Sequence, residues 1–194
     1  YEPAATLKSI AVIGAGPAGM TAAYISAKRG HRVTLFDQRE ELGGQINYAV
    51  KIPGKQEFFE VIRFYRVMLK KYEVELKLGH IISPQSPLSG KYDAVVLATG
   101  VRPRKLELEG ADHSKVLSYL DVLDKERVVG RKVAVIGAGG IGIDVAHYLT
   151  AQTPFSGDVP DYLQGHGILD SNEALEVRKP KKREVTLLQR SSDK

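Results

Sequence analysis

Hydrophobic residues occur in short runs separated by stretches with helical spacing. Residues 9–13 form a continuous apolar run, which is typical of a strand buried on both faces of a parallel sheet. Residues 17–28 predict a helix, because Pro17 suits its first turn and Gly30 suits its end. A second strand is expected at 32–36. The order strand, helix, strand predicts one βαβ unit of the kind that binds a nucleotide.

The middle of the chain changes to a different pattern. Residues 56–72 predict a helix with a single apolar face, since their large apolar residues recur at steps of four, three and four. Residues 74–78 alternate between apolar and charged, which predicts a half-exposed strand. Residues 93–98 predict another buried strand. Residues 101–131 are polar and rich in turns, and we interpret them as the connection to a second unit.

The second unit repeats the beginning of the first. We expect a strand at 132–136, a helix that ends near residue 149 and a strand at 184–188. Residues 150–182 would form an unusually long connection. The fold class is therefore α/β and Rossmann-like, and the second unit is expected to be truncated after its second strand.

Composition narrows the chemistry. The 194 residues include no Cys, which excludes disulfides, thiolate metal sites, cysteine nucleophiles and iron–sulfur ligands within them. The five His residues show no metal-ligand spacing, and no arrangement for hydrolysis is evident. No segment is long and apolar enough to span a membrane, and no signal peptide is evident, so we expect a cytoplasmic protein. Because the sequence does not begin with Met, we expect it to be a piece of a longer chain.

Residues 178–194 account for the whole net charge of +5, because they hold seven basic and two acidic residues. Such a basic run can mark a nucleic-acid binder. We favour a solvated loop before a strand, because no interleaved aromatic residues accompany the run. Neither nucleic acid nor a membrane is expected as a partner.

A glycine fingerprint follows the first strand at Gly14, Gly16 and Gly19. The first glycine permits a tight turn, the second lets a pyrophosphate approach the backbone, and the third allows close packing of helix and strand. The phosphates would lie at the helix N-terminus. Asp37 ends the next strand, where a carboxylate can accept hydrogen bonds from ribose hydroxyls.

A second fingerprint lies at 137–142 and differs from the first in the residues after its second strand. Arg190 and Lys194 stand near the position that Asp37 occupies in the first unit, and basic side chains there suit the 2′-phosphate of NADP. An ordinary surface arginine remains the alternative. Asp144, in the helix after this fingerprint, is expected to interact favourably with the helix dipole.

These motifs resemble the FAD half of two-dinucleotide flavoproteins. The closer resemblance is to the C-terminal part of bacterial NADPH-dependent 2,4-dienoyl-CoA reductase and its old-yellow-enzyme-like relatives. The general resemblance is carried by residues 12–19, 34–37, 42–45 and 98–100. The closer one is carried by residues 44–45, 52–55, 115–123, 139–144 and 188–190.

The resemblance implies an oxidoreductase whose FAD-binding domain covers residues 1–128 and whose partial NADP-binding domain covers 129–194. It further implies a partner region outside this chain, an N-terminal barrel with FMN and a 4Fe–4S cluster. Electrons would pass from NADPH to FAD and on to an enoyl substrate in that barrel. No catalytic acid or base and no metal ligand is expected in this chain. The implied FAD contacts are Gly14, Gly16, Pro17, Ala18, Asp37, Gln38, Gly44, Gln45, Ile82, Ala98, Thr99 and Gly100. The implied NADP contacts are Gly137, Gly139, Gly140, Ile141, Arg190 and Lys194.

The sequence leaves an alternative function open. In related amine dehydrogenases, the equivalent first site holds ADP and passes no electrons, so this chain could be a nucleotide-binding structural module. The chain alone is also expected to bind FAD weakly and to show no turnover.

Overall fold

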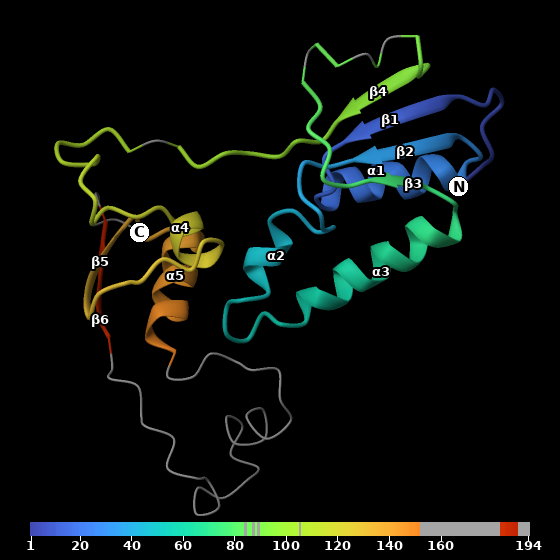
Figure 1. Ribbon diagram of the computed structural model, residues 1–194. Helices are drawn as coiled ribbons and strands as arrows, with labels where there is room; N and C mark the ends of the chain where they lie inside the picture. The colour runs from blue at the N-terminus through green and yellow to red at the C-terminus, as the bar shows by residue number, and fades with distance from the viewer. Residues whose placement is uncertain (84, 87, 89, 105, 152–182, 190–194) are drawn as a thin grey trace, which may run out of the picture. The chain divides into compact units, whose positions relative to one another are not determined.

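The computed structural model describes residues 1–83, 85–86, 88, 90–104, 106–151 and 183–189 (Figure 1). The chain forms two compact units. Unit 1 comprises residues 1–50 and 57–105, and unit 2 comprises residues 51–56 and 106–194. Residues 106–128 thus belong to unit 2, whereas the division expected from the sequence placed them in the first domain.

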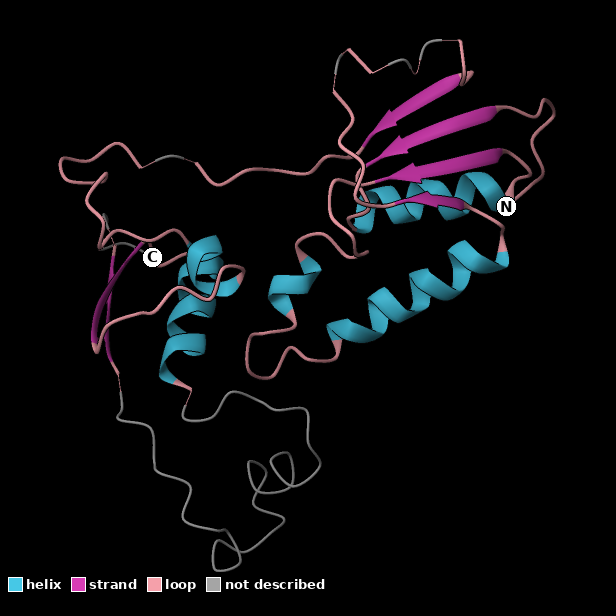
Figure 2. Cartoon of the chain, in the orientation of Figure 1, coloured by secondary structure: helices cyan, strands magenta, loops and turns pink. Residues whose placement is uncertain are grey.

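Unit 1 contains a parallel four-stranded sheet of order β3-β2-β1-β4 (Figure 2). Its strands are β1 (Ser9–Ile13), β2 (Arg32–Phe36), β3 (Glu75–Lys77) and β4 (Ala94–Leu97). Ile13 pairs with Phe36 on one side and with Leu97 on the other. The carboxyl ends of the three strands β2, β1 and β4 are therefore level, and the loops after them begin at one edge of the sheet.

Helices cover one face of this sheet. The helix α1 (Pro17–Lys28) packs on the sheet, and α3 (Phe58–Lys71) packs on α1. A short helix, α2 (Ile46–Ala49), precedes α3 and was not predicted from the sequence. The core contains Ile10, Val12, Ala15, Met20, Ala23, Val33, Leu35, Leu42, Ile62, Leu69 and Val74.

Residues 93–98 were predicted to form a strand buried on both faces. This prediction is wrong for the face that the helices do not cover. Val95 and Leu97 are 46% and 75% exposed. The reason is that helices cover one face of the sheet: Ala94 and Val96 pack against the core on that face, whereas Val95 and Leu97 alternate to the other face.

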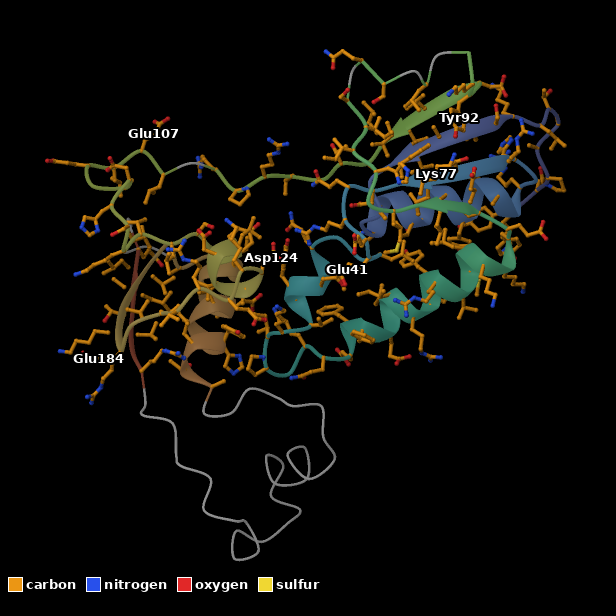
Figure 3. All side chains as sticks on the ribbon, viewed as in Figure 1. Glu41, Lys77, Tyr92, Glu107, Asp124 and Glu184 are labelled. Atoms are coloured by element: carbon orange, nitrogen blue, oxygen red, sulfur yellow. The ribbon has the colours of Figure 1, made fainter. Side chains whose placement is uncertain are left out.

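The opposite face of β2 is covered by local side chains. Phe36 is buried there, and its ring packs edge to face on Tyr92 at a centroid distance of 6.1 Å. The ammonium group of Lys77 lies 5.7 Å from the same ring (Tyr92 and Lys77 are labelled in Figure 3). This packing fixes the end of β2 next to Asp37.

Unit 2 contains a two-stranded parallel sheet of β5 (Lys132–Ile136) and β6 (Glu184–Leu188), which α5 (Gly140–Thr150) contacts. A further short helix, α4 (Tyr119–Leu123), lies within the stretch that we expected to be a connection. Among the described residues of this unit, the buried apolar ones are Ile52, Val122, Leu123, Val145 and Leu149. The core of unit 2 thus joins α4, α5 and residues 51–56. No helix in the described part of the chain is long and apolar enough to cross a membrane.

Candidate dinucleotide-binding sites

The first glycine turn lies against the end of β4. Gly14 has φ +107°, and a Cβ added there would lie 2.3 Å from the carbonyl oxygen of Ala98. The Gly14 N–H donates to the Phe36 carbonyl at 2.7 Å. Only glycine satisfies both the positive φ and the close approach, so the turn is fixed between the ends of β2 and β4.

The other two glycines of this turn differ in surroundings. At Gly19 an added Cβ would lie 1.7 Å from the Gly14 carbonyl oxygen, so this glycine allows α1 to pack on the turn. Gly16 precedes α1 with φ −74° and ψ −179°, and a Cβ added there meets nothing within 4 Å. Space thus lies in front of Gly16, at a helix end whose first N–H groups lack partners within the helix. Pro17 and Ala18 are exposed at the same end.

A diphosphate fits these residues. The free space at Gly16 can admit it, and the N-terminus of α1 supplies N–H donors and a favourable dipole.

The loop of Gly43 and Gly44 packs on the first glycine turn. The Gly43 N–H donates to the Ala15 carbonyl at 2.9 Å. Gly44 has φ +55°, and a Cβ added there would lie 2.8 Å from the Gly16 Cα. The Gln45 side-chain amide donates to the Val101 carbonyl at 3.2 Å, which links this loop to the segment after β4. The sequence pattern gave no indication of that hydrogen bond.

Asp37 connects several parts of the site. One of its carboxylate oxygens accepts from the Ala15 N–H at 2.6 Å, and the other accepts from the Arg39 N–H at 2.8 Å. A carboxylate oxygen has two lone pairs, so Asp37 retains the capacity to accept ribose hydroxyls. The His80 N–H donates to the Asp37 carbonyl at 2.8 Å, which holds the segment leading to half-buried Ile82 beside Asp37.

The structure thus brings together most of the residues that sequence reasoning assigned to the first site. Contacts of their own backbone or side chains join Gly14, Gly16, Asp37, Gly44 and Ala98 at one edge of the sheet. Thr99 and Gly100 come directly after Ala98 and are exposed, as is Gln38. Arg39, which sequence reasoning missed, donates to the hydroxyl of buried Tyr48 and lies over its ring at 5.0 Å.

The second glycine turn repeats the geometry of the first. Gly137 has φ +107°, and its N–H donates to the Leu188 carbonyl at 2.8 Å. Gly139 has φ −81° and ψ −179° before α5. A Cβ added at Gly142 would lie 1.8 Å from the Gly137 carbonyl oxygen. The same fit for a diphosphate therefore exists at the N-terminus of α5.

The surroundings of the second turn are more open. A Cβ added at Gly137, Gly139 or Gly140 meets nothing within 4 Å, so in the described residues nothing corresponds to the contact of Gly14 with Ala98. Ile141 is 55% exposed. Arg190 and Lys194, which we assigned to the 2′-phosphate, lie outside the described residues.

An ion pair beside the second turn was missed by sequence reasoning. The ammonium group of Lys55 lies 2.7 Å from both carboxylate oxygens of Asp144, which is on α5. Lys51 donates to the Leu123 carbonyl at 2.7 Å and pairs with Glu126 at 3.0 Å. The expectation that Asp144 lies on the first turn of the helix and interacts with its dipole is wrong, because α5 begins at Gly140 and has no acidic residue in its first turn. The partner of Asp144 is Lys55. Hydrophobic periodicity carries no signal for a pair 89 residues apart.

Shifted pKa values occur away from the two glycine turns. Hydrogen bonds from Ser9, first of all from its backbone N–H, hold the pKa of Asp93 below its ordinary value. The Thr34 hydroxyl lowers the pKa of Glu75 in the same way. These carboxylates connect neighbouring strands. Among the described residues, no group of three or more His, Asp or Glu could hold a metal ion.

The fold and the paired turns define a Rossmann-like protein of the FAD- and NAD(P)-binding class. The sequence pattern of one family, pyridine nucleotide-disulphide oxidoreductase, matches residues 8–193. The chain belongs to this family, and membership supports binding of FAD and of NAD(P).

Three similar proteins illustrate the relationship. Cinnamate reductase of Clostridium sporogenes is 40% identical over 156 residues, which cover 78% of this chain and 22% of the relative. The structure of 2-naphthoyl-CoA reductase in complex with 2-naphthoyl-CoA is 31% identical, with a TM-score of 0.73, over 86% of this chain and 27% of that protein. The 6-hydroxypseudooxynicotine amine oxidase of Pseudomonas geniculata N1 is 25% identical, with a TM-score of 0.67, over 96% of this chain and 30% of that protein. The chain therefore spans less than a third of each.

Proposed function

We propose that this chain is the FAD- and NADPH-binding part of a flavoprotein reductase. The observation that carries the proposal is the repeated turn: Gly14 and Gly137 share φ +107°, and each is followed by a glycine that closes the helix against it. Two such turns in one chain suit two dinucleotides. The bound cofactors supply the chemistry, which is hydride transfer from the reduced nicotinamide to the flavin.

In the first site, the residues of this chain bind and orient FAD. The space at Gly16 and the N-terminus of α1 receive the diphosphate, and Asp37 accepts hydrogen bonds from the adenosine ribose. Gly44 and Gln45 approach the remainder of the FAD, and Ala98 to Gly100 border it. The close packing of Gly44 on Gly16 supports this assignment, because it joins the two loops that would contact one ligand.

In the second site, Gly139, Gly140 and Ile141 receive the phosphates of NADPH at the N-terminus of α5, and Gly137 forms the turn. Arg190 and Lys194 would pair with the 2′-phosphate. Replacing both basic residues with Gln removes that pairing, so the preference for NADPH over NADH should fall. Kinetics with each cofactor measure the ratio, and an unchanged ratio contradicts the assignment of the 2′-phosphate site.

For the whole protein, we propose an enzyme similar to 2,4-dienoyl-CoA reductase, located in the cytoplasm. A further region with FMN and a 4Fe–4S cluster would accept electrons from the FAD and reduce a conjugated enoyl substrate. Two of the relatives support this class of substrate, since cinnamate is a conjugated acid and 2-naphthoyl-CoA a conjugated acyl thioester. Their greater length leaves room for such a region.

A second candidate is a module that holds ADP and passes no electrons. It is favoured by the similarity to an amine oxidase and by the location of the diphosphate space at Gly16, which ADP would fill as well as FAD. The two candidates differ in the nucleotide that the full-length protein releases on denaturation. Chromatography should identify FAD, whereas ADP without FAD would contradict the proposed electron transfer.

A further inference from the structure

The ion pair of Lys55 and Asp144 lies on the helix that begins at the second glycine turn. Lys55 contacts both carboxylate oxygens at 2.7 Å, and the two side chains are 40% and 31% exposed. Asp144 is five residues beyond Gly139, about 7.5 Å along the axis at the usual rise of an α-helix. It is the first charged residue of α5.

A carboxylate at this position opposes the proposed ligand. The phosphates of NADPH are negative, and the N-terminus of α5 attracts them through its N–H groups and its dipole. An unpaired carboxylate within about a Debye length would repel those phosphates and offset part of that attraction. In the structure, Lys55 cancels the charge of Asp144.

Lys55 reaches α5 because the segment that carries it is fixed to unit 2. Residues 51–56 lie between α2 and α3 in sequence but pack with unit 2. Ile52 is 1% exposed, and Lys51 donates to the Leu123 carbonyl at the end of α4. Lys51, Ile52 and Lys55 thus all hold this short segment in unit 2. Of the three, Lys55 pairs with α5, the helix that follows the second glycine turn.

We propose that Lys55 is a positioning residue for the second dinucleotide, which it serves by neutralising Asp144. This inference rests on the proposed function. It assigns a role in the NADPH site to a residue that precedes the second glycine fingerprint by more than eighty positions and contacts no phosphate in the proposal.

The test is a double-mutant cycle on NADP⁺ affinity, measured by isothermal titration calorimetry on the full-length protein. Lys55→Met should weaken NADP⁺ binding about tenfold, or about 1.4 kcal/mol. Asp144→Asn leaves Lys55 unpaired and should keep or raise the affinity, and the double variant should return to within about twofold of wild type, because neither charge remains. Lys51→Met is the matched control: it removes the same charge from the same segment but leaves buried Ile52 and the Lys55–Asp144 pair to hold that segment, so affinity should stay within about twofold of wild type.

Other results would overturn the inference. Unchanged affinity in Lys55→Met means that the charge of Asp144 does not matter. A double variant as weak as Lys55→Met means that Lys55 acts directly or through folding, and an equal loss in Lys51→Met means that anchoring of the segment is responsible. If the wild-type protein binds neither NADP⁺ nor NAD⁺, the proposed function fails and this inference with it. Normal wild-type binding with no effect of Lys55→Met overturns the inference alone.

Discussion

Glycines with the same spacing serve different purposes at the residue scale. A Cβ at Gly19 would collide with the Gly14 carbonyl, whereas a Cβ at Gly16 would meet no protein atom within 4 Å. The sequence predicts that both positions belong to a turn. Spacing alone gives no measure of the space around each glycine, which depends on where β4 and the Gly43-Gly44 loop lie. We therefore expect a side chain at Gly19 to affect stability and a side chain at Gly16 to affect ligand binding.

Gly19→Ala should destabilise the fold by about 1–3 kcal/mol, the usual cost of overpacking. Chemical denaturation of the full-length protein, followed by the unfolding of the FAD-binding domain, measures the change in the free energy of unfolding. Wild-type stability in this variant would show that α1 can move away from the turn without cost.

Gly16→Ser should leave stability within about 1 kcal/mol, because Ser is a good residue before a helix and φ −74° suits it. FAD binding should weaken at least about tenfold, about 1.4 kcal/mol, since the side chain enters the diphosphate space. Equilibrium titration of the apoprotein with FAD checks this. Gly139→Ser is the control at the second turn and should weaken NADP⁺ binding while FAD binding stays normal. Equal loss of both ligands in either variant argues against two separate sites.

At the scale of elements, the strands and long helices agree closely with the apolar pattern. The helix predicted at 17–28 and the strands predicted at 9–13, 32–36, 132–136 and 184–188 have the bounds that the structure shows. The short helices were missed, since a helix of four or five residues is too short for its periodicity to be recognised. The placement of residues 51–56 in unit 2 was also beyond prediction, because it depends on contacts between distant positions.

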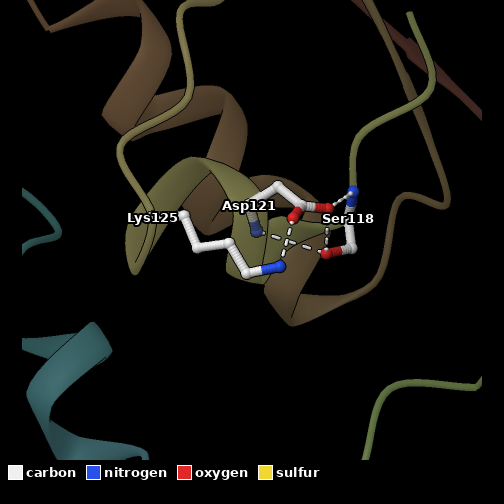
Figure 4. Close-up of polar contacts among 3 residues, drawn as sticks. All are labelled: Ser118, Asp121 and Lys125. Carbon is white, nitrogen blue, oxygen red and sulfur yellow. Dashed lines mark hydrogen bonds and ion pairs between the residues drawn. The ribbon is translucent and has the colours of Figure 1, made fainter. Parts of the chain in front are cut away.

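The short helix α4 is held by a capping box (Figure 4). The Ser118 hydroxyl accepts from the Asp121 N–H at 3.2 Å, and the Asp121 carboxylate accepts from the Ser118 N–H at 2.9 Å. The motif Ser-x-x-Asp was visible in the sequence and could have located this helix. Hydrogen bonds from Lys125 and then from Ser118 hold the pKa of Asp121 well below its ordinary value.

The depressed pKa makes the stability of α4 depend on pH. A carboxyl whose pKa is lower in the folded state stabilises the fold above its unfolded pKa, near 3.9, and this contribution disappears as the pH falls further. Asp121→Asn should therefore cost about 1 kcal/mol at pH 7 and progressively less below pH 4. Hydrogen exchange of α4 amides at pH 7, together with urea unfolding across the acidic range, tests this. A cost that stays constant down to pH 2 would show that the charge of Asp121 is irrelevant.

At the scale of the whole molecule, the sequence predicted an α/β protein with two nucleotide-binding units, and the fold class is confirmed. The order β3-β2-β1-β4 in unit 1 places the consecutive strands β1, β2 and β3 next to one another, as is usual for sequential strands. The substrate was not predictable, because no residue of this chain is expected to contact it. The relatives extend well beyond the region that this chain matches, and the acceptor region that we propose belongs to that additional length.

The central claim is that this chain passes reducing equivalents from NADPH to FAD. The most direct measurement is anaerobic stopped-flow absorption of the full-length protein mixed with NADPH. We predict that the absorption of the bound FAD bleaches in the wild-type protein and that Gly139→Ser raises the NADPH concentration required for half-maximal bleaching. A protein that retains FAD but leaves it oxidised in the presence of saturating NADPH would contradict the account.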